Sequence, residues 1–270
     1  MAAPACRIEP ELAERVQALA LETYGDGLEL VFHPQCFLSH GHFAGPDAAR
    51  RDAFVELAND DNFHAVWFAR GGYGACRIAE DAIARLNGAA RRKAYLGYSD
   101  MGMMLAGLYA QGIGEVAHGP MPCDLKRTEG VAAVRRALSW LAERDPAAVE
   151  PAARERKTAA FNIATFSQLL GTPLQPDLTD HVLMLEEIDE HLYRIDRFLF
   201  HVTSNPGVRR CAGLMLGRCS EIPENDPDFQ ATEEEVFAHW CERSGLPDLG
   251  RADIGHDAEN KVVPFGGVRI

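Results

Sequence analysis

The sequence of 270 residues predicts an α/β protein whose first half forms a doubly wound parallel sheet. Strand-like apolar runs alternate with helical segments from the N-terminus to about residue 144. One run, residues 63–69, is apolar over nearly its whole length, as expected of a strand covered on both faces. Residues 144–158 are rich in Ala, Pro and charged residues and have no apolar stripe, which predicts a linker.

The elements of the first half follow from periodicity and capping signals. Residues 9–24 have helical spacing, with Pro10 suited to a first turn. Residues 28–33 (LELVFH) predict a strand, and residues 45–60 predict a helix that Asp47 could cap. The other elements expected here are helices at 77–87 and 131–144, a helix after residue 98, and strands at 63–69, 93–98 and 115–120.

Beyond the linker the pattern is less regular. A helix is expected at 232–245, where Thr232 and Glu235 have the spacing of a capping box. The remaining expected elements are strands at 181–187 and 211–218, a helix at 193–205, and a tail at 255–270 of loop and then a short strand. We therefore divide the chain into domains at 1–143 and 159–270, joined by the linker 144–158.

The composition excludes several classes of protein. The formal net charge of −13 argues against a nucleic-acid surface, which needs clustered Lys and Arg. The seven cysteines are scattered without a CxxC pair, so reduced thiols are expected rather than a disulfide framework. The N-terminus lacks the pattern of a secretion signal, and no run reaches 18 apolar residues. These features predict a soluble cytoplasmic protein without a membrane partner.

A serine stands at the boundary between a predicted strand and a predicted helix. In YLGYSD, residues 95–100, the apolar run ends at a glycine, and Ser99 comes two residues later. Ser99 could be a nucleophile held on a sharp turn, or it could cap the helix that follows, which is the commoner use of serine. The sequence G-x-S-x-x-G differs from the G-x-S-x-G elbow of hydrolases, so that motif is not met.

A glycine-rich turn, FARGGYGACR at residues 68–77, follows the neighbouring predicted strand. Gly71 and Gly72 would let the backbone approach a ligand and direct N–H groups at it. The turn lacks both the GxGxxG and the GK[ST] patterns, so phosphate binding is weakly supported. Because ligands collect at the carboxyl ends of parallel strands, an oxyanion hole beside Ser99 is the alternative.

A nucleophilic serine needs a base, and the base needs a partner. Of the ten histidines, His256 lies among loop-type residues, where functional groups concentrate, and His118 after a short strand is the second candidate. Glu186 and Glu187 end a strongly apolar strand. A buried carboxylate there would need a partner, because burying an unpaired charge is costly.

The chain contains five short motifs, which are in order RGGYG, GYSD, HGPM, LEE…YRIDR and GH. Together they resemble the LD-carboxypeptidase family of serine peptidases, which includes the microcin-immunity peptidases. The likeness runs from about residue 43 to the end. It implies a Ser-Glu-His triad of Ser99, Glu186 and His256, with Glu187 as the alternative acid. The backbone N–H groups of Asp100 and of Gly72 or its neighbour would then form the oxyanion hole.

The resemblance also implies a fold, a substrate and a cellular setting. It implies a Rossmann-like N-terminal domain with a parallel sheet and a smaller β-rich C-terminal domain, with the active site in a groove between them. It further implies a cytoplasmic homodimer that releases D-alanine from murein tetrapeptide during cell-wall recycling. The alternatives are a microcin-immunity-type peptidase that cleaves a peptidyl-nucleotide antibiotic, and a non-catalytic protein that binds a small ligand.

Other side chains near these motifs are further candidates for binding. Arg70, Gly71 and Tyr73 are candidate substrate-binding residues. Arg70 could bind a substrate carboxylate through two hydrogen bonds or could only tie loops together. A run of metal-ligand types at short spacing has no second cluster to complete a tetrahedral site, so neither a metal nor a cofactor is expected; its members are His33, Cys36, His40 and His42.

Overall fold

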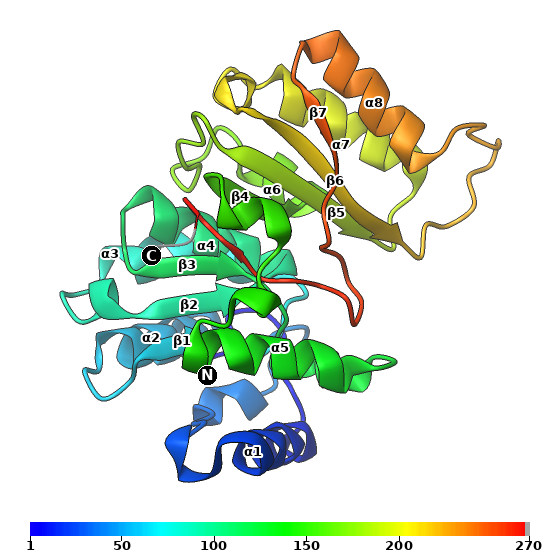
Figure 1. Cartoon of the computed structure of the whole chain (residues 1–270). Coiled ribbons are helices and arrows are strands. Elements are labelled where there is room, and N and C mark those ends of the chain that lie inside the picture. Colours follow the sequence, from blue (N-terminus) through cyan, green and yellow to red (C-terminus); the bar gives the residue numbers. More distant parts are fainter. Residues whose placement is uncertain (268–270) are drawn as a thin grey trace.

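The computed structural model describes residues 1–267, in which two four-stranded sheets are each flanked by helices (Figure 1). The first sheet has the order β1-β2-β3-β8, and the second has the order β4-β5-β6-β7. The last three residues of the predicted tail, 268–270, lie outside the described residues. The α/β class predicted from the alternation of strands and helices is confirmed.

The first sheet is parallel except at one edge. Its parallel strands are β1 (Ala65–Trp67), β2 (Ala94–Gly97) and β3 (Glu115–His118), and β8 (Val263–Pro264) pairs antiparallel to β3. The helices around it are α1 (Pro10–Tyr24), α2 (Asp47–Asn59), α3 (Ala79–Ala84), α4 (Gly102–Ala110) and α5 (Gly130–Glu143).

Alternation of side chains explains why these strands are apolar throughout. Val66 and Tyr95 belong to the apolar cluster that includes residues of α2, α3 and α4. Their neighbours Trp67 and Leu96 belong to the opposite cluster, with residues of α1 and α5. Because both faces are covered, neither set of alternating side chains can be polar.

The second sheet is parallel in all its pairings. Its strands are β4 (Thr158–Asn162), β5 (Val182–Ile188), β6 (Gly213–Ser220) and β7 (Asp248–Arg251). Three helices, α6 (Ile163–Leu169), α7 (Leu192–Ser204) and α8 (Glu233–Ser244), accompany it in the upper part of Figure 1. The predicted capping box of α8 is present, because Glu235 N–H donates to Thr232 Oγ1 and Thr232 N–H donates to Glu235 Oε2.

The strand predicted at 28–33 is wrong. The segment lies instead against the N-terminus, where His33 N–H donates to Met1 C=O, and the next residue, Ala2, pairs with Phe68 after β1. Residues 28–33 run between two short 3₁₀ turns, and Leu30 C=O accepts from the Gln17 side chain. Asp47 is also not the cap of α2, because Pro46 holds that position.

The segment 144–158 is packed rather than extended in solvent. Ala148, Val149 and Ala153 are buried, and Val149 pairs with Val262. Strand β8 then crosses from the second half of the chain to the first sheet, where Phe265 N–H donates to Val116 C=O. The crossing satisfies the otherwise free edge of β3. Elements that the sequence analysis did not predict are β4, α6 and β7.

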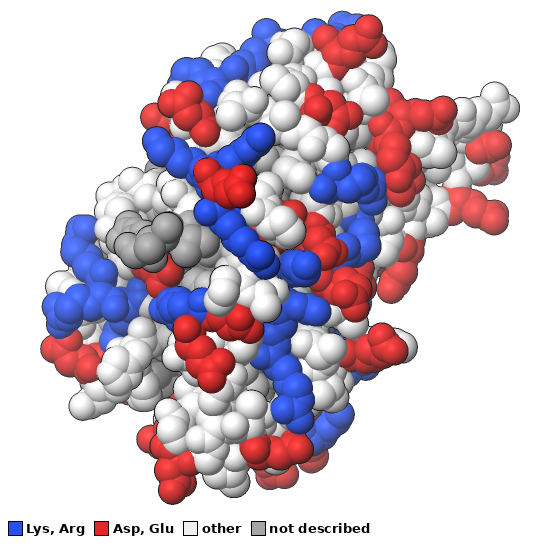
Figure 2. All heavy atoms as spheres, viewed as in Figure 1, with Lys and Arg blue, Asp and Glu red and all other residues white. Residues whose placement is uncertain are grey.

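Charged side chains of both signs are interspersed on the face of the molecule in Figure 2. Within residues 1–267, none of the helices is long and apolar enough to cross a lipid bilayer.

Candidate active site

Ser99 lies at the carboxyl end of β2 in a strained backbone conformation. Its φ of 60° is in the left-handed region, which residues other than glycine seldom adopt. It begins a 3₁₀ turn, Ser99–Met101, that leads into α4, and its hydroxyl caps neither of these helical segments. Strain of this kind costs about 1–3 kcal/mol and is concentrated at functional sites. The conformation therefore favours the nucleophile over the capping alternative.

The glycine turn after β1 lies against Ser99. A Cβ atom on Gly71 would be 3.0 Å from Ser99 Cβ and 3.1 Å from Ser99 Oγ, so only glycine fits without displacement. Gly72 has a φ of +108°, and its N–H donates to no group in residues 1–267. The turn and the serine thus meet at the ends of two neighbouring parallel strands, as the sequence predicts.

We expect Gly71→Ala to lower kcat/KM about 100-fold, because the new methyl group must displace Ser99 or the turn. Steady-state kinetics on a peptide substrate measure the change. Gly88→Ala is the matched control, since a Cβ there meets nothing within 4 Å, and it should retain wild-type kinetics. Equal activity of the two variants would contradict the close approach of the turn to Ser99.

A carboxylate and an imidazole form a buried pair. Glu186, at the end of β5, is fully buried, and its Oε2 lies 2.6 Å from Nδ1 of His256 in the loop after β7. Since a carboxylate only accepts, Nδ1 carries the proton of this hydrogen bond, and Nε2 remains able to accept another. Burial lowers the pKa of His256, but the charge and hydrogen bond of Glu186 outweigh it and raise the pKa overall.

Glu187 faces away from His256, as alternation along a strand requires. Its carboxylate accepts hydrogen bonds from Asn162 Nδ2 at 2.5 Å and from Ala164 N–H at 2.8 Å, at the start of α6. Burial, and then the charge of Glu186, raise the pKa of Glu187 to about 7. The structure therefore places Glu186 rather than Glu187 beside the histidine.

Tyr98 links the serine to the histidine. Its ring centroid lies 4.7 Å from that of His256, and its hydroxyl donates to Asp124 Oδ1 at 2.6 Å. Ser99 is the next residue, so the turn that carries it contacts the loop that carries His256. Among residues 1–267 no hydrogen bond joins Ser99 Oγ to the His256 ring. Apo active sites often have this looser geometry.

His118, the second candidate base, has a structural position instead. It is almost fully buried, and its Nε2–H donates to Asn260 Oδ1 at 3.2 Å. Burial lowers the pKa of His118 to about 4, so the ring is neutral. Asn260 lies in the loop that carries His256 and also accepts from Gly255 N–H. His118 thus holds that loop against the first sheet.

The remaining predicted residues surround the turn. Asp100 is buried, and its Oδ2 accepts from Ala75 N–H at 2.9 Å, which ties the serine turn to the glycine-rich loop. Burial raises the pKa of Asp100 to about 6. Arg70 is exposed and donates to Arg7 C=O at 3.2 Å. Tyr73 is 51% exposed, beside the ring of His42.

The run of possible metal ligands does not converge. His33 pairs with Glu56, and His42 lies 3.3 Å from Cys6 Sγ. Cys36 is buried, with its thiol donating to Met1 C=O. Across residues 1–267 no three His, Cys, Asp or Glu side chains are placed to share a metal ion.

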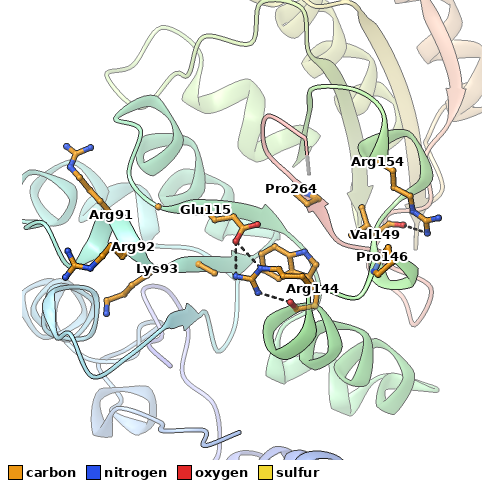
Figure 3. A pocket seen from close by; sticks show the side chains of 12 residues that line it. Arg91, Arg92, Lys93, Glu115, Arg144, Pro146, Val149, Arg154 and Pro264 are labelled. Atoms are coloured by element: carbon orange, nitrogen blue, oxygen red, sulfur yellow. Dashed lines mark hydrogen bonds and ion pairs between the residues drawn. The ribbon is translucent and has the colours of Figure 1, made fainter. Parts of the chain in front are cut away.

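A cavity of about 460 Å³ lies at the amino ends of the strands of the first sheet, opposite the end that carries Ser99 (Figure 3). It is lined by the residues at which β2 and β3 begin, including Ala94 and Glu115. Arg144 inside it is paired with Glu115 at 2.8 Å. Arg91 and Lys93 extend away from that pair in Figure 3. Because Ser99 follows the carboxyl end of β2, this cavity is separate from the candidate site.

Sequence reasoning missed the residues that position the predicted ones. Tyr98 stands inside the quoted YLGYSD stretch, and Asn260 comes four residues after His256. Asp124 follows the HGPM motif closely. Closeness to a motif was the only signal available for them, because their contacts join segments distant in the chain.

Comparisons with known proteins cover nearly the whole chain. Residues 1–119 match the LD-carboxypeptidase N-terminal domain, and residues 157–269 match its C-terminal domain. A putative carboxypeptidase of Synechocystis is 30% identical over 89% of this chain and 80% of its own. The murein tetrapeptide carboxypeptidase of Pseudomonas aeruginosa is 23% identical over 98% of this chain and 89% of its own.

Solved structures share the fold. The crystal structure of muramoyltetrapeptide carboxypeptidase from Oxalobacter formigenes has a TM-score of 0.79 and 23% identity, covering 98% of this chain and 92% of the other. A microcin C7 self-immunity protein has a TM-score of 0.77 and 16% identity, covering 98% and 90%.

Proposed function

Because the chain belongs to the LD-carboxypeptidase family and is a carboxypeptidase, we propose that Ser99, Glu186 and His256 hydrolyse an L,D-peptide bond and release D-alanine from murein tetrapeptide. The observation that carries the proposal is the buried Glu186–His256 pair against Tyr98, the residue before Ser99. The murein peptide carboxypeptidases among the relatives support the substrate.

In the first step, His256 Nε2 takes the proton of Ser99 Oγ, and the oxygen attacks the carbonyl carbon before the terminal D-residue. Glu186 holds the ring through Nδ1 and stabilises its charged form. The N–H groups of Gly72 and Asp100 donate to the oxyanion. Collapse of the intermediate breaks the C–N bond, and His256 gives its proton to the departing amine.

In the second step, water replaces the amine. His256 takes a proton from the water as the oxygen attacks the acyl-enzyme ester, and it returns that proton to Ser99 Oγ as the ester bond breaks. The products are the shortened peptide acid and the free D-amino acid. Besides the peptide and water, the two steps use Ser99, His256, Glu186 and the two oxyanion N–H groups.

Hydrolysis of synthetic L,D-tetrapeptide, followed by mass spectrometry, tests the proposal. We expect D-alanine and tripeptide from the wild-type protein and neither from Ser99→Ala. Cleavage of an aspartyl-nucleotide analogue in place of the tetrapeptide would support the microcin-immunity alternative, for which the structural likeness shows the fold alone. A serine-directed phosphonate that adds no mass to the Ser99 peptide would support a non-catalytic binding protein.

The pH dependence of kcat/KM reports on the proposed base. His256 must be neutral to accept a proton, so activity rises as pH passes its pKa. Since that pKa is raised, we expect the acid limb to lie above the ordinary histidine value of about 6.5. In Glu186→Gln the acid limb of the pH profile of the residual kcat/KM should move to lower pH, because the charge that raises the pKa of His256 is removed. An unmoved limb would show that another group titrates.

The family resemblance also supports a cytoplasmic homodimer. All the cysteines within residues 1–267 are free thiols, as is usual for proteins of a reducing compartment. Light scattering coupled to size exclusion should give twice the chain mass of 29.6 kDa. Cell fractionation should recover the protein with cytoplasmic markers, and recovery with the membrane or medium would contradict this location.

A further inference from the structure

A small cationic pocket adjoins the candidate active site. It has a volume of about 230 Å³ and is lined by Ile8, by Leu12 of α1 and by Arg70, Lys126 and Arg127. Three cations at one pocket contrast with the acidic balance of the whole chain. The apolar side chains of Ile8 and Leu12 give the pocket one wall that cannot hydrogen-bond to a ligand.

The cations are poorly neutralised. Asp124 is the one carboxylate that lines the described pocket. Its oxygens already accept from the Tyr98 hydroxyl at 2.6 Å, from Met121 N–H at 2.8 Å and from Arg127 Nε at 3.0 Å. Within residues 1–267, the two terminal nitrogens of Arg127 and the Lys126 amine have no hydrogen-bond or ion-pair partner.

The pocket is joined to the reacting groups from two sides. Arg70 directly precedes Gly71, where an added Cβ would lie 3.0 Å from Ser99 Cβ and 3.5 Å from Met121 Cε. On the other side, Arg127 and Tyr98 share the Asp124 carboxylate. Burial has the largest effect on the pKa of His256, and Glu186 has the next largest. The Arg127 charge also lowers this pKa, so Arg127 lies near the His256 ring.

We propose that this pocket binds the free α-carboxylate of the substrate's terminal D-residue, with Arg127 as the main donor and Lys126 and Arg70 beside it. The inference rests on the proposed function, because a carboxypeptidase must recognise a chain end. Two unpaired guanidinium nitrogens match the two oxygens of a carboxylate. The volume of about 230 Å³ is sufficient for one short residue with its carboxylate.

A pair of substrates tests the pocket, namely an L,D-tetrapeptide acid and the same peptide with a C-terminal amide. We expect the wild-type protein to prefer the acid by about 100-fold in kcat/KM, because the amide leaves the cations unpaired. Arg127→Gln should lower kcat/KM for the acid by a similar factor and leave the amide little changed. Arg127→Lys should recover part of the preference.

The ratio of kcat/KM for the acid to kcat/KM for the amide distinguishes a binding role of Arg127 from a structural one. If Arg127 only holds Asp124 in place, Arg127→Gln slows both substrates equally and the preference persists. Arg91→Gln is the matched control, because Arg91 lines the cavity at the amino ends of the strands, and it should keep the wild-type ratio. An unchanged ratio in each of the Arg127→Gln, Lys126→Gln and Arg70→Gln variants overturns the inference, as does a wild-type protein without preference.

Binding of the product gives a second readout that needs no turnover. Calorimetric titration of Ser99→Ala protein should show D-alanine binding and at least 10-fold weaker binding of D-alaninamide. Arg127→Gln added to this variant should abolish the difference. A wild-type protein that cleaves neither peptide refutes the proposed function, and in that case failure of D-alanine to bind refutes the pocket separately.

Discussion

Replacing Ser99 by alanine is expected to lower kcat by about 10⁴–10⁶-fold, the effect typical of removing the nucleophile of a triad. Within residues 1–267 the hydroxyl caps no helix and makes no hydrogen bond to the His256 ring, so its loss removes no contact described there. Active-site titration with a phosphonate and single-turnover hydrolysis should both give no signal. More than a tenth of wild-type activity would remove Ser99 from the nucleophile role.

Ser99→Gly is the control that separates chemistry from folding. Glycine adopts a φ of 60° without the steric cost of a side chain, whereas alanine keeps that cost. Both variants should be inactive, but Ser99→Gly should be the more stable, by about 1 kcal/mol in urea unfolding. Greater stability of Ser99→Ala would show that the left-handed conformation is not retained in solution.

Replacing Glu186 by glutamine is expected to lower kcat by about 10⁴-fold. The amide keeps the shape of the side chain but carries no charge, so it cannot stabilise the imidazolium that forms when Ser99 loses its proton. It can also present its NH₂ group to Nδ1 and so favour the wrong tautomer of His256. Pre-steady-state measurement of acylation gives the effect directly.

Glu187→Gln is the matched control one residue away. Its carboxylate accepts from Asn162 and from α6, so the change should cost stability and leave kcat within about tenfold of wild type. A large loss of kcat in Glu187→Gln, with activity retained in Glu186→Gln, would assign the acid to Glu187. The two variants thus test the register of β5 independently of the fold.

The meeting of Ser99 with the glycine turn could be predicted because it follows from parallel pairing. Each segment comes after an apolar strand, and carboxyl ends of parallel strands share one sheet edge. The choice between Glu186 and Glu187 could not be made in the same way. Both follow the same apolar run, and the pairing of β5 with β6 shifts register between Leu185 and Glu187.

Contacts between distant segments account for the other differences. The pattern of residues 28–33 is compatible with a strand, but Ala2 pairs with Phe68 and His33 N–H donates to Met1 C=O, and local sequence does not reveal these contacts. The short strand expected in the tail is present as β8, but its pairing with β3 could not be predicted from local sequence. Tyr98 and Asn260 likewise depend on neighbours that pairing of the sheets brings together.

Strand β8 also makes the order of synthesis matter. The first sheet cannot be completed until Val263 and Pro264 have left the ribosome, although β1 to β3 emerge far earlier. Such non-local pairing slows folding, and the exposed edge of β3 is open to wrong partners during the delay. Since His256 lies in the segment that leads to β8, a nascent chain lacks its proposed base until then. We therefore expect the nascent chain to be inactive until the segment that carries His256 has emerged and β8 has paired with β3.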